Sequence, residues 1–239
     1  MPENKELQNP IIKTRGLEKT YYTGQIETPV LKGIDLDIGQ GEFVAIMGKS
    51  GAGKSTLMYQ ISLLDQPTGG SISVDGTDIL ALNESQRTDF RLNQLGYVFQ
   101  DYALVPELSA LENIAIPMFM QGRETEIAYQ RAQEVLDAIG MQGKYDNRPN
   151  QLSGGEQQRV SIARGVAQNP KILFADEPTA NLDSSSSEAV IEVLKGLHEK
   201  GQTIVMVTHE PEYTKYCDRI IYLEDGLITD YDYKIKSNY

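Results

Sequence analysis

The sequence has little cysteine and no long apolar run. Its only cysteine, Cys217, leaves no intrachain disulfide and no cysteine-rich metal site, and we predict that this small residue is buried or half-buried. No run approaches the ~20 apolar residues that span a bilayer. The opening letters, MPENKELQNPIIKTRG, lack a basic segment followed by an apolar one. We therefore expect a soluble chain that is not secreted.

Basic residues are also outnumbered. There are 22 Lys and Arg against 34 Asp and Glu, a net charge of -12. Such a charge repels a phosphate backbone, so nucleic acid is not expected as a partner. The sequence also has no low-complexity stretch and no internal repeat. With 239 residues, 40% of them hydrophobic, it can bury a full core as one domain, or as one domain with an inserted lobe.

The stretch GEFVAIMGKSGAGKST carries a phosphate-binding pattern. The apolar run Phe43–Met47 predicts a buried parallel strand, and the spacing of apolar residues over Ser55–Leu64 predicts a helix. Between them lies G-x-x-x-x-G-K-S, a glycine-rich turn that aims backbone N–H groups at a polyphosphate. We expect Lys54 to reach the β- and γ-phosphates and the Ser55 hydroxyl to ligate Mg²⁺. The predicted cradle consists of Gly48, Ser50, Gly51, Gly53, Lys54, Ser55 and Thr56.

Two adjacent carboxylates end a second apolar run. Residues 172–175 are apolar and lead into Asp176 and Glu177. The carboxyl end of a buried strand is where open α/β sheets bind ligands. We expect Asp176 to hold Mg²⁺ through its water shell and Glu177 to face the attacking water as general base. Alone, such a pair usually caps a helix or lies in a solvated turn; beside a phosphate loop, chemistry is favoured.

Polar residues follow two further apolar strands. His209 comes after the run 204–208, in the same predicted sheet, and is a candidate to bond the γ-phosphate or the attacking water. Gln100 ends GYVFQ, and its amide can ligate Mg²⁺ or orient water without taking a proton. The other histidine, His198, is predicted to lie on the surface of a helix.

The stretch QLSGGEQQRV at 151–160 completes a set of motifs. Together with the phosphate loop, Gln100, Asp176–Glu177, the ANLD segment at 180–183 and His209, it resembles the ATP-binding cassette family over nearly the whole chain. The resemblance implies an ATPase that uses ATP and Mg²⁺. It also implies that Tyr21 stacks on adenine, with Tyr22 as the alternative ring. Further nucleotide contacts are implied for Ser153, Gly154, Gly155 and Asp183.

The stretch QLSGGEQQRV resembles the signature motif of the family, and we expect this signature to act as a second γ-phosphate clamp. Its glycines allow close backbone approach, its serine is a donor, and a helix begins nearby. Because the phosphate loop already surrounds the triphosphate, and because a predicted helical lobe precedes the signature, the clamp should close on the nucleotide of another subunit. The resemblance implies the same arrangement, a head-to-tail homodimer with two ATP sites.

The order of elements predicts an α/β fold. We expect a P-loop NTPase (RecA-like) core with a mainly parallel sheet, an N-terminal antiparallel β element and an inserted helical lobe, all in a single domain over 1–239. The lobe is expected at about 101–165. Within it, Met118, Phe119 and Met120 suggest a groove for a partner helix, although core packing is the alternative for each.

The sequence departs from the family pattern at Lys49, where proline is usual, and at Asn181, where alanine or glycine is usual. Either change is expected to alter rates without changing the reaction, with Lys49 adding a cation near the phosphates. The tyrosine-rich end, DYDYKIKSNY at 230–239, is predicted to be mobile or lightly packed.

Within the family, the chain is most similar to the ATPase subunits of lipoprotein-releasing, macrolide-efflux and peptide-export systems. This implies a separate integral-membrane permease as partner and a peripheral location on the cytoplasmic face of the membrane. Three alternatives stay open: a cell-division ATPase that drives a partner without transport, a soluble ATPase acting on nucleic acid or the ribosome, and a regulatory module that does not hydrolyse ATP.

Overall fold

The computed structural model describes residues 9–233, which divide into two compact units. The first unit is formed by 1–88 and 201–239, and the second by 89–200. The bounds of the inserted lobe, about 101–165, remain a prediction.

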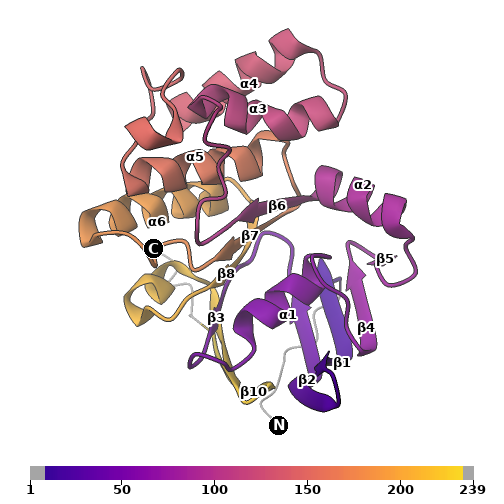
Figure 1. The fold of residues 1–239 in the computed structure, drawn as a ribbon. Helices are drawn as coiled ribbons and strands as arrows, with labels where there is room; N and C mark the ends of the chain where they lie inside the picture. Colours follow the sequence, from indigo (N-terminus) through magenta and orange to yellow (C-terminus); the bar gives the residue numbers. More distant parts are fainter. Residues whose placement is uncertain (1–8, 234–239) are drawn as a thin grey trace. The chain divides into compact units, whose positions relative to one another are not determined.

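The N-terminal part of the first unit is an antiparallel sheet, as predicted, with the strand order β2-β1-β4-β5 (Figure 1). Buried residues alternate with exposed ones in the first half of β1, because one face of the strand is buried and the other faces solvent. The strands are β1 (Ile12–Thr23), β2 (Ile26–Ile38), β4 (Gly69–Val74) and β5 (Thr77–Asp78).

The rest of the first unit contains the strand order β10-β9-β3-β8, in which β3 runs parallel to both β8 and β9. Every residue of β3 and of β8 is buried, which explains their continuous apolar sequences. Cys217, just before β9, is buried as predicted. The strands are β3 (Phe43–Met47), β8 (Thr203–Val207), β9 (Arg219–Glu224) and β10 (Leu227–Tyr233), with a 3₁₀ turn η2 (Pro211–Tyr216).

The helix after the phosphate loop, α1 (Lys54–Ile61), is shorter than the predicted Ser55–Leu64. Leu63 takes a left-handed conformation with a φ of 59°, and the side chain of Leu64 is 44% exposed. Pro67 follows closely, and a proline disfavours helical backbone in the residue before it. The apolar spacing therefore continues past the point where the helix ends.

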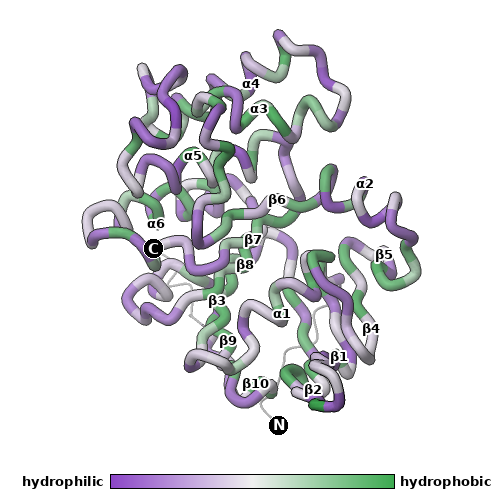
Figure 2. Tube along the Cα trace, in the orientation of Figure 1, coloured by the Kyte–Doolittle hydropathy of each residue, from purple (hydrophilic) through white to green (hydrophobic). Residues whose placement is uncertain are grey.

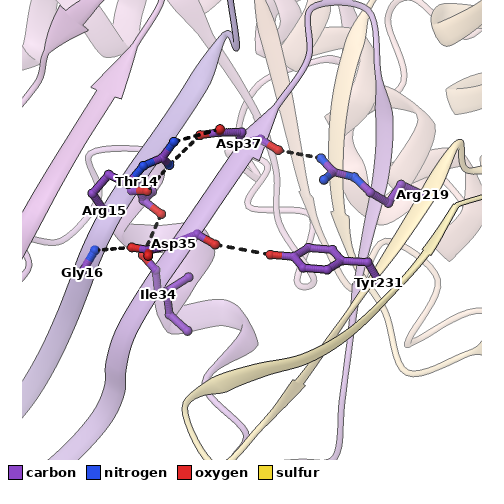
Figure 3. A network of polar contacts seen from close by, with 8 residues as sticks. All are labelled: Thr14, Arg15, Gly16, Ile34, Asp35, Asp37, Arg219 and Tyr231. Atoms are coloured by element: carbon purple, nitrogen blue, oxygen red, sulfur yellow. Dashed lines mark hydrogen bonds and ion pairs between the residues drawn. The ribbon is translucent and has the colours of Figure 1, made fainter. Parts of the chain in front are cut away.

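A buried arginine contacts the last strand; residues 230–233 pair with β9 but none of them is buried, which agrees with the predicted light packing. The guanidinium of Arg219 donates to the Asp37 carbonyl oxygen at 2.7 Å and lies against the Tyr231 and Tyr233 rings, with centroids at 5.7 and 5.4 Å. The Tyr231 hydroxyl donates to the Asp35 carbonyl oxygen at 3.3 Å (Figure 3). Burial raises the pKa of Tyr231 to about 12. The remaining tail residues, 234–239, lie outside the described part.

The second unit combines a parallel strand pair, β6 (Leu95–Val98) and β7 (Ile172–Asp176), with a group of helices (Figure 1). Helix α5 packs against β6, α3, α4 and α6. The helices are α3 (Ala110–Met120), α4 (Thr125–Ala138), α5 (Gly154–Ala167) and α6 (Ser184–Glu199), with a 3₁₀ turn η1 (Pro149–Gln151).

Helix α2 (Glu84–Gln94) crosses the division between the units and was not predicted. None of its residues is buried, and it is mostly hydrophilic in Figure 2, whereas β3 and β6 are mostly hydrophobic. Only Phe90 and Leu92 in this helix are apolar, so the sequence offers too few apolar residues to reveal it.

The apolar cluster at the end of α3 separates into core and surface. Met118 is fully buried, whereas Phe119 and Met120 are 37% and 65% exposed. The Phe119 ring packs edge-on against Tyr129 of α4, with centroids 5.5 Å apart. Met118 is therefore a core residue, and only the other two are available to a partner.

We expect Gly96→Ala to destabilise the protein by about 3 kcal/mol, because a methyl group at Gly96 of β6 would overlap the carbonyl oxygen of Gly165 in α5. The matched control is Gly196→Ala in α6, where the added methyl group meets nothing within 4 Å. That change should instead stabilise by about 0.5–1 kcal/mol, because alanine favours the helix. Urea denaturation midpoints check both; equal effects would contradict the close packing of β6 on α5.

Candidate active site

The phosphate loop joins β3 to α1 and depends on its glycines. Gly51 and Gly53 have φ values of 81° and 100°, in the left-handed region that side chains disfavour. Glycine is required at position 48 for a different reason, because a methyl group there would overlap the carbonyl oxygen of Leu223. These glycines let the backbone form a tight turn at the start of α1.

The start of α1 suits an anion. Gly53 provides no side-chain cap, and the first helical turn has no acidic residue, so its positive end is not neutralised locally. Lys54 is 7% exposed, and its ammonium donates to the carbonyl oxygens of Gly48 and Lys49 at 2.9 and 3.1 Å. The ammonium thus lies inside the loop. The predicted Ser50 lies in this loop, and Ser55 and Thr56 lie in the first turn of the helix.

The turn between β9 and β10 supports this loop, which the sequence motifs did not indicate. The N–H of Gly226 donates to the carbonyl oxygen of Ala52 at 3.1 Å. Lys49, the departure from the family pattern, places its ammonium 3.6 Å from the Glu224 carboxylate, and both side chains are largely exposed. An exposed pair of this kind contributes little to stability. Lys49 is therefore an exposed cation next to the phosphate loop.

His209 belongs to the same unit as the phosphate loop. In the parallel pair of β3 and β8, Ile46 lies opposite Val207, and the N–H of Thr208 donates to the Ile46 carbonyl oxygen at 3.2 Å. The next residue, His209, is exposed. It therefore leaves β8 at the end of the sheet where the phosphate loop leaves β3, as its predicted role requires.

The two candidate aromatic rings for adenine both lie on β1. Tyr21 is 40% exposed and Tyr22 is 64% exposed. The hydroxyl of Tyr21 donates to the carboxylate of Asp65 at 3.0 Å. Asp65 lies in the segment that follows the end of α1. Tyr21 is thus linked to the segment that follows the phosphate-loop helix.

In the second unit, the predicted carboxylates and Gln100 follow neighbouring strands. Val98 of β6 lies opposite Ala175 of β7, so Gln100 and Asp176 lie at the same end of the parallel pair. Asp176 is 6% exposed, and Gln100 is exposed. Glu177 has a φ of 44°, and a left-handed conformation in a residue with a side chain is typical of functional sites.

A buried glutamine that the motifs did not single out, Gln158, ties this region together. From α5 its amide donates to the carbonyl oxygen of Pro178 at 2.9 Å and to that of Phe99 at 3.4 Å. Asn181, the second departure from the family pattern, donates to the carbonyl oxygen of Gln100 at 3.4 Å. The helix that begins at the signature is therefore bonded to the segments carrying Gln100 and Glu177.

The signature begins α5 with a reciprocal cap. Ser153 is the N-cap; its hydroxyl oxygen accepts from the N–H of Glu156 at 3.3 Å, and the Glu156 carboxylate accepts from the N–H of Ser153 at 2.9 Å. The backbone N–H of Ser153, and then the Lys144 ammonium, lower the pKa of Glu156. A hydroxyl that accepts one bond keeps a hydrogen to donate, and Ser153 is exposed.

Close packing leaves no room for a side chain at Gly154 or Gly155, apart from the access that glycine gives to a ligand. A methyl group on Gly155 would lie 2.8 Å from the Ser186 Cβ, and one on Gly154 would lie 2.9 Å from the Tyr102 hydroxyl oxygen. Asp183 caps α6 by accepting from the N–H of Ser186 at 3.0 Å. Hydrogen bonds from the Ser185 and Ser186 hydroxyls lower its pKa, so it remains charged.

The residues proposed for Mg²⁺ fit the donors that this ion prefers. Within residues 9–233, no group of three or more His, Cys, Asp or Glu side chains is arranged to hold a metal. Nucleotide-bound Mg²⁺ usually takes one or two protein oxygen ligands, together with phosphates and water. The hydroxyl of Ser55, the carboxylate of Asp176 and the amide oxygen of Gln100 are ligands of this kind.

No helix in the described part of the chain combines the length and the apolar character needed to cross a membrane.

Comparison with known proteins gives a consistent result. Residues 31–180 match the model of a family described as "ABC transporter". The lipoprotein-releasing system ATP-binding protein LolD 2 of Caulobacter vibrioides is 44% identical, over 92% of this chain and 97% of that protein. The macrolide export ATP-binding/permease protein MacB of Aggregatibacter actinomycetemcomitans is 46% identical over 91% of this chain, which spans only 34% of that longer protein.

Among solved structures, the ATP-binding cassette MJ0796 is similar over almost its whole length. Its dimeric structure in a post-hydrolysis state, bound to ADP and Pi, has a TM-score of 0.86 and 41% sequence identity, and the match covers 93% of this chain and 98% of that one. Fold and sequence therefore agree on the same kind of protein.

Proposed function

Because the chain belongs to the ABC transporter family and is an ATP-binding ATPase of that family, we propose that it works as a head-to-tail homodimer that hydrolyses ATP at two shared sites. In this arrangement each site combines the phosphate loop of one copy with the signature of the other. The observation that carries the proposal is the likeness to MJ0796, which is dimeric with ADP and Pi bound. The exposed Ser153 at the start of α5 supports it, since its hydroxyl keeps a hydrogen to donate to a phosphate oxygen.

Each predicted residue then has a role. Lys54 and the N–H groups at the start of α1 bind the phosphates, Glu177 takes the proton of the attacking water, and His209 donates to the γ-phosphate. Gln100 orients the water. When bound, Mg²⁺ held by Ser55 and Asp176 would neutralise charge that develops on the phosphate oxygens. Ser153 of the other copy adds a donor to the same oxygens, and Asp183 keeps the start of α6 in place.

We propose that hydrolysis drives a separate integral-membrane permease and that the protein lies on the cytoplasmic face of the membrane. The chain is 44% identical to a lipoprotein-releasing ATP-binding protein over nearly the full length of that protein, and 46% identical to part of a macrolide exporter. Both similarities support an export system of lipoprotein, macrolide or peptide type. The exposed Phe119 and Met120 of α3 are the proposed contact for a short helix of the permease.

The test is co-purification of the tagged chain from detergent-solubilised membranes. One integral-membrane protein should be recovered in an amount comparable to the chain. Met120→Asp should remove most of that protein, because a charge is placed in an apolar contact, while ATP hydrolysis by the purified chain is retained. Met120→Leu, which keeps the apolar contact, is the matched control. Recovery of ribosomes or DNA in place of a membrane protein would contradict the proposed partner.

A further inference from the structure

The carboxylate of Asp65 is the centre of a polar network between β1 and the segment after α1. It accepts from the Tyr21 hydroxyl at 3.0 Å, from the Lys19 ammonium at 2.9 Å and from the Gln60 amide at 3.0 Å. The N–H of Gln66 adds a fourth bond at 2.7 Å. Donors of this number and kind hold a carboxylate in a single orientation.

Two of the donors to Asp65 are shielded from solvent, whereas the Asp65 side chain is 31% exposed. Lys19 is 8% exposed and Gln60 is 1% exposed. The Lys19 ammonium also donates to the carbonyl oxygen of Gln66 at 2.6 Å. Bonds of this kind are screened less by water and salt than those of exposed pairs.

Lys19 also lies over the Tyr21 ring, with its ammonium 4.8 Å from the ring centroid. A cation at this distance is attracted to the face of the ring. One face of Tyr21 is thus occupied by a residue of its own strand, while the ring is still 40% exposed. The opposite face is the one left for a ligand. Tyr22 is on the same strand but points to the other side, because successive side chains alternate.

We propose that Asp65 is a positioning residue for the nucleotide base: it fixes the Tyr21 ring through its hydroxyl, so that the free face of the ring stacks on adenine. The proposal rests on the assignment of Tyr21 as the adenine platform in the proposed function. It also selects Tyr21 over Tyr22.

The position of Asp65 along the chain links the base platform to helix α1. Helix α1 begins at Lys54 in the phosphate loop and ends at Ile61, shortly before Asp65. Eight helical residues span about 12 Å. The side chain of Thr56, in the first turn of α1, also interacts with the Tyr21 hydroxyl, so the base platform is tied to both ends of the helix that carries the phosphate cradle.

The experiment measures binding of two probes by calorimetry, MgATP and magnesium tripolyphosphate, which has the phosphates without the base. Asp65→Asn should weaken ATP binding about tenfold and leave tripolyphosphate binding within about twofold, because only the base contact depends on the network. Tyr21→Phe should have a similar effect, and combining it with Asp65→Asn should add little, since Asp65→Asn weakens the bond that Tyr21→Phe removes. Asp35→Asn, which alters a carboxylate bonded elsewhere in the unit to the N–H of Gly16 at 2.6 Å, is the matched control and should bind both probes like the wild type (Figure 3).

The outcomes separate this proposal from the proposed function. If Tyr21→Ala leaves ATP affinity unchanged, Tyr21 is not the base platform, and the premise fails. If Tyr21→Ala weakens ATP binding but Asp65→Asn does not, the platform stands and the role of Asp65 is wrong. If Asp65→Asn weakens both probes equally, Asp65 supports the phosphate loop in general, and the positioning proposal is likewise overturned.

Discussion

Glu177→Gln is expected to lower the rate of ATP hydrolysis by about 10³-fold while leaving ATP binding intact. The amide has nearly the same shape as the carboxylate but cannot take a proton from the attacking water. It also removes a negative charge beside the γ-phosphate, so the ATP-bound dimer should accumulate. Phosphate release measures the first effect, and light scattering after size-exclusion chromatography in MgATP measures the second.

The control for this change is Glu134→Gln on α4, an exposed glutamate in an ion pair with Arg131 at 3.4 Å. It removes the same charge elsewhere in the second unit and should leave hydrolysis and oligomeric state unchanged. Wild-type hydrolysis by Glu177→Gln would exclude Glu177 as the base. Lost hydrolysis with no trapped dimer would leave the base assignment in place and contradict the ATP-driven dimer.

The second large effect is expected at the signature. Ser153→Ala removes a donor from the γ-phosphate of the partner copy, and loss of one such donor typically lowers turnover by about 10²-fold. In the Glu177→Gln background it should also abolish ATP-driven dimerisation. Binding of ATP to the monomer should change by less than about twofold, because the phosphate loop of the same copy supplies that site. Calorimetry and light scattering distinguish the two properties.

Ser153→Ala also removes a helix cap, which costs about 1 kcal/mol, and the chain offers a matched control for that loss. Ser109 caps α3 with the same reciprocal bonds to Glu112 that Ser153 makes to Glu156. Ser109→Ala should lower stability by a similar amount and leave dimerisation intact. If both serine variants dimerise alike, the signature serine acts only as a cap. If Ser153→Ala loses monomer binding, the shared-site arrangement is wrong.

Much of the fold could be predicted from the sequence because its strands are continuous apolar runs that end in motifs. The runs at β3, β7 and β8 are fully buried, and each leads directly into a predicted site residue. Helix α2 could not be predicted, because no residue in it is buried and only two of its residues are apolar. The extent of α1 was overestimated because Leu63 and Leu64 continue the apolar spacing beyond the helix.

The residues expected to contact the nucleotide could be predicted, because their side-chain chemistry is recognisable in the sequence. The residues that hold these segments in place could not be predicted. Lysine, serine and paired carboxylates identify a phosphate site directly. Gln158, Asp65 and Gly226 support neighbouring segments through bonds to residues distant in the sequence. Nothing in their local sequence indicates those partners, so these contacts emerge only from the folded chain.

The packing of the β9–β10 turn against the phosphate loop has a consequence for synthesis on the ribosome. The loop, near residue 50, is translated long before Leu223 and Gly226, which contact it. Contacts between residues so far apart in the sequence form late in folding. The nascent chain therefore carries a complete phosphate motif long before the backbone around it can take its final shape, and that shape forms only after residues 223–226 have been translated.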